Sequence, residues 1–117
     1  MAKDILFLLK PFRNPKAGPD VYFCTECASL EGLLSYHPEL KNTVEARRIA
    51  FEKPRQEVVD LLGEALQSAP VLVLAEDSKT EAPAIQVSPK TGRRYVAGFR
   101  PIADYLAAAY QVTKLHP

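Results

Sequence analysis

Two uninterrupted apolar runs constrain the fold of this chain most strongly. One lies in residues 4 to 10, which read DILFLLK, and the other in residues 71 to 75, which read VLVLA. A strand with one face in water alternates apolar and polar residues, whereas these runs have the pattern of strands buried on both faces. Strands of this kind lie in sheets that helices cover, so the two runs predict an α/β protein.

Helical periodicity and proline positions predict three helices beside these strands. The first begins at or near Cys24 and ends at about His37, because Pro38 follows. Pro54 suits the first turn of the second helix, and Pro101 opens the third. The first two helices separate predicted strands along the chain, and the third follows the last strand.

The other strands are predicted from short apolar segments between turn residues. Residues 43 to 51 form one strand, residues 84 to 87 and 94 to 97 form a hairpin, and residues 11 to 22 form a loop rich in proline. We expect a single domain over residues 1–117 with the order β-α-β-α-β-β-α. Its mixed four-stranded sheet has parallel pairs plus a C-terminal antiparallel hairpin, and three helices flank it.

Composition and charge exclude several classes of protein. Of the 117 residues, 47% are apolar and 25% charged, and the net charge of +1 provides no field that attracts nucleic acid or an anionic membrane. The longest apolar run, Ile5 to Leu9, is too short to span a bilayer. Asp4 and Lys10 bracket that run, so the N-terminus lacks a secretory pattern. We expect a cytoplasmic protein that binds neither nucleic acid nor membrane.

The two cysteines of the chain, Cys24 and Cys27, are spaced as Cys-x-x-Cys. A reducing compartment and the short spacing argue against a stabilising disulfide, which leaves redox chemistry, half of a metal site, or coincidence. Cys24 lies where a loop enters a helix, and unpaired N–H groups there favour the thiolate. Cys27 lies one turn further in. The spacing favours Cys24 as the nucleophile that attacks a disulfide and Cys27 as the resolving thiol.

Two other interpretations of the dithiol stay open. Glu26, inside the motif, opposes thiolate formation, which favours a non-enzymatic binding or interaction module. Zinc usually has four ligands, and the chain has no second cysteine pair, so we expect no metal site within one chain. A dimer that shares a metal through two cysteine pairs is the remaining alternative.

The dithiol and a later proline together resemble the thioredoxin superfamily. A strand, then Cys-x-x-Cys at a helix start, then Pro70 opening a further strand is the pattern of that superfamily. Residues 54 to 74 and 99 to 110 resemble glutaredoxins and the N-terminal domain of glutathione transferases, which share the I-x-x-Y-L pattern found here from Ile102 to Leu106. The chain also resembles a small bacterial family of thioredoxin-like proteins with no established function.

The resemblance implies a thioredoxin-like fold and a thiol–disulfide oxidoreductase or redox-responsive protein. It implies that Cys24 is the nucleophile, that Cys27 resolves, and that Ala69–Pro70 is cis and faces the cysteines. It further implies that the Ala69 backbone pairs with the cysteinyl backbone of glutathione, a candidate co-substrate. The expected partners are protein or small-molecule disulfides, with no tightly bound cofactor.

Two aromatic residues next to the dithiol complete the candidate site. Tyr22 and Phe23 directly precede Cys24 and are candidates for an apolar wall against a substrate. Packing in the protein core is the equally weighted alternative for both.

Overall fold

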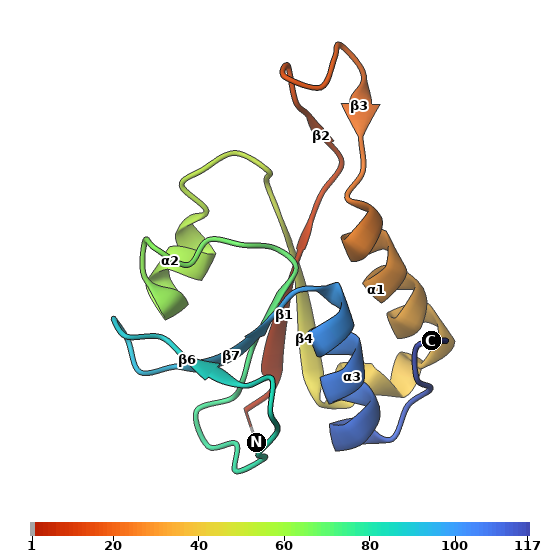
Figure 1. The fold of residues 1–117 in the computed structure, drawn as a ribbon, viewed down its shortest axis with the longest axis vertical. Helices are drawn as coiled ribbons and strands as arrows, with labels where there is room; N and C mark the ends of the chain where they lie inside the picture. The colour runs from red at the N-terminus through yellow and green to blue at the C-terminus, as the bar shows by residue number, and fades with distance from the viewer. Residues whose placement is uncertain (1) are drawn as a thin grey trace.

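A computed structural model, which describes residues 2–117, shows an α/β fold with three α-helices and a mixed sheet (Figure 1). The main sheet consists of β1 (Asp4–Leu9), β4 (Val44–Ile49), β5 (Val71–Val73), β6 (Gln86–Val87) and β7 (Arg94–Ala97). The helices are α1 (Thr25–Tyr36), α2 (Gln56–Leu62) and α3 (Phe99–Tyr110), and a 3₁₀ helix, η1 (Pro38–Asn42), follows α1.

The strand order in the main sheet is β4-β1-β5-β7-β6. β1 runs parallel to β4 and antiparallel to β5, and the pairs β5–β7 and β6–β7 are antiparallel. A mixed sheet was predicted and is present, but the expected parallel pairs reduce to one, β1–β4, because β5 pairs with β1 in antiparallel orientation. The expected count of four strands was wrong by one: the hairpin predicted over residues 84 to 87 and 94 to 97 is present as β6 and β7, and together with β1, β4 and β5 it makes five strands.

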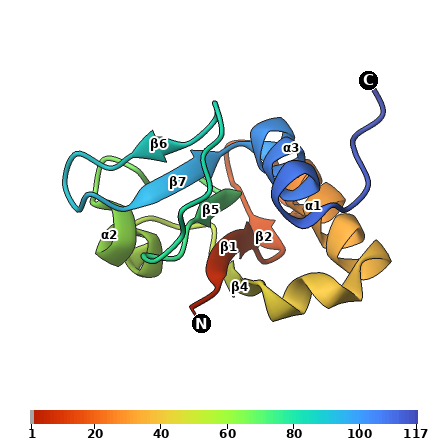
Figure 2. The same cartoon turned by 90° about the horizontal axis from the view of Figure 1, so that it is seen from below.

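Helices cover both faces of the sheet, which explains the uninterrupted apolar runs. Leu6 and Leu8 point to the side of α1 and α3, where they pack with Leu30 and Leu106. Phe7, between them, points to the other side and packs with residues of α2. Figure 2 shows α1 and α3 together on one side of the strands and α2 on the other. Neighbouring residues of β1 therefore face two separate apolar clusters.

A second, two-stranded sheet projects from the body in the segment predicted to be a loop. It pairs β2 (Phe12–Arg13) with β3 (Val21–Tyr22) in antiparallel register, and it rises at the top of Figure 1. The N–H groups of Ala17 and Gly18 donate to the carbonyl of Asn14 and close the turn. We call residues 10–23 the arm. The loop prediction was wrong here because two-residue strands carry no readable alternation.

The start of α2 also differs from the prediction. Pro54 precedes α2, which begins at Gln56, and the Lys53–Pro54 peptide bond is cis. Arg55 holds this junction, since its guanidinium donates to the carbonyls of Phe51 and Gln67. α3 begins at Phe99, so Pro101 lies in its first turn rather than at its first residue.

The helices are short compared with the thickness of a bilayer. α1 and α3 have 12 residues each, and within residues 2–117 none of the helices has the length and apolarity needed to cross a membrane.

Candidate functional site

Cys24 is the N-cap residue of α1, as its position before the helical stripe predicted. Its backbone is extended, and its Sγ accepts a hydrogen bond from the N–H of Cys27 at 3.1 Å. The side chain is half-buried and its thiol is free. A sulfur in this place satisfies one of the helix's unpaired N–H groups.

Cys27 lies one turn further along α1, in a different environment. Its side chain is only 2% exposed, and its Sγ accepts a hydrogen bond from the N–H of Leu9 at 3.4 Å. Burial raises the pKa of the Cys27 thiol to about 12, and the hydrogen bond to Cys24 adds to the increase. Cys27 is therefore protonated near neutral pH. The dithiol thus combines a half-buried sulfur that caps the helix, on Cys24, with a buried thiol, on Cys27.

The Ala69–Pro70 segment reaches the same end of the sheet as the dithiol. The peptide bond between these residues is cis, as the resemblance implied. β1 and β5 are antiparallel and pair Phe7, near the end of β1, with Val71, the first residue of β5. The N–H of Leu9, the last residue of β1, binds Cys27 Sγ. The start of β5 and the dithiol therefore lie toward the same end of β1.

Glu26 connects the dithiol helix to α3. Its Oε1 accepts a hydrogen bond from the N–H of Phe99 at 3.3 Å, and the N–H of the preceding residue, Gly98, donates to the carbonyl of Pro70 at 3.3 Å. These contacts join the starts of α1, β5 and α3 at one corner of the molecule. The Glu26 charge also contributes to the raised pKa of Cys27, after burial and the Cys24 sulfur. This contact was not predictable from local sequence patterns, because 73 residues separate Glu26 and Phe99.

The two aromatic residues before Cys24 have different surroundings. Tyr22 lies in β3, and its hydroxyl donates to the carbonyl of Ala17 at 3.0 Å, so this side chain braces the arm. Phe23 is 65% exposed. The core-packing alternative is therefore wrong for Phe23, whose ring is free to contact a partner next to Cys24.

A family model matches residues 3–114, almost the whole chain. The chain belongs to the family described as "Protein of unknown function (DUF3088)". No curated protein and no solved structure matches it. The family description assigns no activity.

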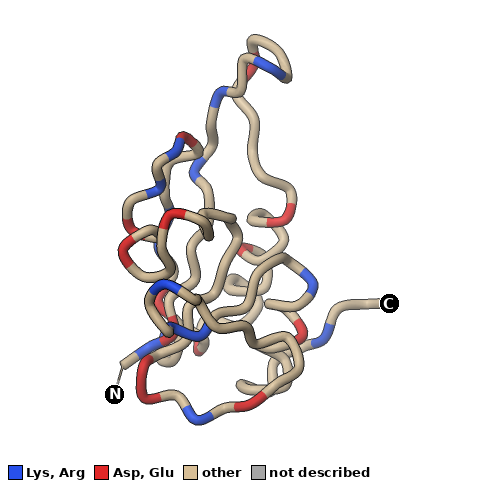
Figure 3. The backbone as a smooth tube through the Cα atoms, turned by 60° about the vertical axis from the view of Figure 1, so that its left-hand side comes forward, with Lys and Arg blue, Asp and Glu red and all other residues tan. Residues whose placement is uncertain are grey.

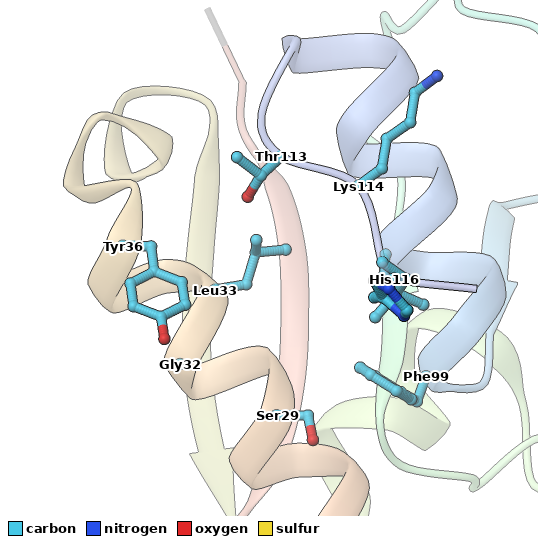
Figure 4. Close-up of a pocket in the computed structure, with 10 residues that line it drawn as sticks. Ser29, Gly32, Leu33, Tyr36, Phe99, Thr113, Lys114 and His116 are labelled. Carbon is cyan, nitrogen blue, oxygen red and sulfur yellow. The ribbon is translucent and has the colours of Figure 1, made fainter.

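The DUF3088 chain has a separate hollow of about 400 Å³ between α1, α3 and the C-terminal tail (Figure 4). Its lining includes Ser29, Leu33, Phe99 and Lys114, and neither cysteine is part of it. His37 holds the tail over this hollow, since its Nε2 lies 2.9 Å from the Thr113 hydroxyl and accepts from the Thr113 N–H at 3.3 Å. The hollow is therefore distinct from the dithiol site.

No His, Cys, Asp or Glu side chains of residues 2–117 gather in threes or more in a way that could hold a metal ion. Cys24 and Cys27 by themselves supply two sulfurs, fewer than the four ligands of a structural zinc site.

Proposed function

We propose that the protein is a thioredoxin-like thiol–disulfide oxidoreductase or redox-responsive protein of the glutaredoxin-like type. The observation that carries the proposal is the hydrogen bond from the Cys27 N–H to Cys24 Sγ at the N-terminus of α1. This contact holds the Cys24 sulfur at the start of the helix, where we propose that it is the nucleophile, while Cys27 is the buried second thiol. The β4-β1-β5-β7 order and the cis Ala69–Pro70 bond just before β5 support the thioredoxin-like assignment.

The proposed reaction is a two-electron exchange in two displacements. The Cys24 thiolate attacks one sulfur of a substrate disulfide, forms a mixed disulfide, and releases the other substrate sulfur as a thiolate that takes up a proton. Cys27 then loses its proton to solvent, and its sulfur attacks Cys24 Sγ. The Cys24–Cys27 disulfide forms as the second substrate thiol leaves. The substrate disulfide is reduced to two thiols and the protein dithiol is oxidised.

The environment of Cys27 supports this order of events. A thiol whose pKa is about 12 does not compete with Cys24 for the substrate at neutral pH. Its attack becomes intramolecular once the mixed disulfide has formed, so the low thiolate fraction is offset by proximity. The proposed substrates are protein or small-molecule disulfides, with glutathione as a candidate co-substrate. A reducing cytoplasm would keep the resting protein in the dithiol form.

The test measures exchange with three oxidants: oxidised glutathione, insulin and hydroxyethyl disulfide. The reduced wild-type protein is expected to form an intramolecular disulfide, which mass spectrometry detects as a loss of two hydrogens. The Cys24→Ser variant is expected to be inert. The Cys27→Ser variant is expected to stop at a mixed disulfide. Equal rates for wild type and Cys24→Ser would show that the proposed chemistry is wrong.

Cys24 alkylation and metal analysis separate the two alternatives, the binding module and the metal-sharing dimer. A protein that alkylates at Cys24 as slowly as an ordinary cysteine and exchanges with no disulfide is a binding module on this fold. A stoichiometric metal in freshly purified protein, lost on Cys24→Ser substitution, identifies the metal-sharing dimer.

A further inference from the structure

The arm that leads into Cys24 exposes apolar side chains that the fold itself does not use. Val21 is 56% exposed and Phe23 is 65% exposed, two of the few large apolar side chains left in water. Both lie within three residues of Cys24. Exposed apolar groups clustered next to a reactive group are typical of a contact surface for a partner.

The arm holds a fixed shape. The Tyr22 hydroxyl donates to Ala17 across the turn, and the Arg13 guanidinium donates to the carbonyl of Pro19 at 3.0 Å. At its foot, the ring of Phe12 stacks on Phe51, with centroids 4.2 Å apart and planes 5° apart. A braced surface of this kind binds a partner without the entropy cost of ordering a loop.

The arm carries an excess of positive charge. Lys10, Arg13 and Lys16 lie on it with a single acid, Asp20. Within residues 2–117 the ion pairs involve other basic residues, such as Arg47 with Glu45 and Arg48 with Glu31, and none of the three cations of the arm. Figure 3 shows blue segments along the projecting end of the tube. The charge on the arm is therefore open to an anionic partner.

A hollow at the foot of the arm joins the apolar and the charged groups. It has a volume of about 350 Å³, and its lining includes Lys10, Phe12, Arg13, Val21 and Phe51. Glu52 is the one acid in that lining. An apolar floor between two cations fits an apolar side chain that has acidic neighbours.

We propose that the arm is the docking element for a protein substrate, and that it binds an extended acidic segment next to the substrate's disulfide. The inference rests on the proposed function, and it adds the class of substrate. Phe23 contacts the segment beside the sulfurs, the hollow accepts an apolar side chain, and Lys10, Arg13 and Lys16 attract the acidic residues. Glu26, the acid nearest to Cys24 in sequence, is directed to the Phe99 amide.

The test compares the rates of three disulfide oxidants, two charged and one uncharged, at low ionic strength. Two synthetic peptides carry the same mixed disulfide with 2-mercaptoethanol, one flanked by glutamates and one by lysines, and hydroxyethyl disulfide is the small uncharged reference. Wild-type protein is expected to react about tenfold faster with the acidic peptide than with the basic one, a ratio that salt reduces. Equal rates, or a preference for the basic peptide, would overturn the docking proposal.

Matched charge reversals test whether the preference for the acidic peptide comes from the arm. Lys10→Glu with Lys16→Glu is expected to abolish the preference for the acidic peptide. Lys41→Glu with Lys79→Glu changes the net charge equally at exposed lysines outside the arm and is expected to retain the preference. Loss of the preference in both double variants, or in neither, would show that the arm does not dock the peptide.

An independent variant removes the apolar contact. Phe23→Ala is expected to slow both peptides about threefold more than it slows hydroxyethyl disulfide, since partner contacts of aromatic side chains carry much of the binding. An unchanged peptide rate would contradict the proposed contact. A protein that fails to react even with hydroxyethyl disulfide would instead contradict the proposed function, so the two failures are distinguishable.

Discussion

The backbone N–H of Phe99 donates a hydrogen bond to the carboxylate of Glu26 and so joins the first residue of α3 to the second residue of α1. The acid between the two cysteines is thus held by the N-terminus of another helix. That position satisfies an otherwise unpaired N–H and lets a negative charge interact with the positive ends of two helix dipoles.

Substitution of Glu26 is expected to weaken the packing of α1 on α3. Glu26→Ala removes both the acceptor and the charge and should lower the free energy of unfolding by about 0.5–1.5 kcal/mol. Glu26→Gln keeps an acceptor for the Phe99 N–H and should lie between wild type and Glu26→Ala. Urea denaturation of the three proteins checks this order. If Glu26→Ala is as stable as wild type, the contact contributes nothing.

Native alkylation is expected to distinguish the two cysteines. At pH 8, iodoacetamide should modify Cys24 and leave Cys27 intact, because Cys27 is buried and its pKa is raised to about 12. Peptide mapping after a short reaction identifies the modified residue. Denaturation in urea should make both cysteines reactive. Comparable labelling of both thiols in the folded protein would contradict the buried position of Cys27.

The same raised pKa predicts a loss of stability in alkaline solution. Because Cys27 holds its proton more tightly in the folded protein than in the unfolded chain, the stabilisation is complete below pH 9 and is lost as the pH rises toward 12. The free energy of unfolding should therefore fall across that interval more steeply in wild type than in Cys27→Ala. The Cys27→Ala variant keeps Tyr105 and Tyr110, whose pKa values burial also raises. Their contribution is therefore common to both proteins, and the difference between the two curves reports Cys27.

Two tyrosines of α3 provide a matched pair for a stability test. The Tyr110 hydroxyl donates to the carboxylate of Asp4, which is 2% exposed and also accepts from the Ala75 N–H at 2.8 Å. The hydroxyl of Tyr105 is buried and has no hydrogen-bond partner among the described residues. Tyr110→Phe should cost about 1–3 kcal/mol, and Tyr105→Phe should be near neutral. Thermal unfolding of both variants measures the difference, and equal costs would contradict the assignment.

The contact between His37 and Thr113 is expected to protect the C-terminal tail from proteolysis. His37→Ala removes the side chain that binds both the hydroxyl and the N–H of Thr113. Trypsin should then cleave faster after Lys114 in the tail. His116→Ala is the control, because His116 bonds only to its neighbour Pro117. Mass spectrometry of a digestion time course gives the rates, and the contact has no protective role if His37→Ala and wild type are cleaved alike.

Elements with a strong local pattern were predictable from the sequence. The helix start at Cys24 follows from an apolar stripe that begins after a loop, and β1 and β5 follow from their uninterrupted apolar residues. The arm was missed because its strands are two residues long and are held by contacts such as Phe12 with Phe51, 39 positions apart. Pro54 was assigned to α2 because proline is common in a first helical turn, whereas α2 begins two residues later, at Gln56.

The candidate site was predictable only in part for the same reason. The motif spacing and the helix start indicated Cys24 and Cys27, because both signals are local. The neighbours that define their chemistry, Leu9 beside Cys27 and Phe99 beside Glu26, come from other elements. Contacts between residues so far apart along the chain produce no periodic pattern or motif that a single sequence would show.

The paired ends of the arm, Phe12 opposite Tyr22, give the protein a modular design. The chain leaves the body and returns to it at two points one strand spacing apart, so the segment between them can be shortened, lengthened or exchanged while Cys24 remains at the head of its helix. The proposed docking element can therefore change without altering the start of α1, where the proposed sulfur chemistry lies.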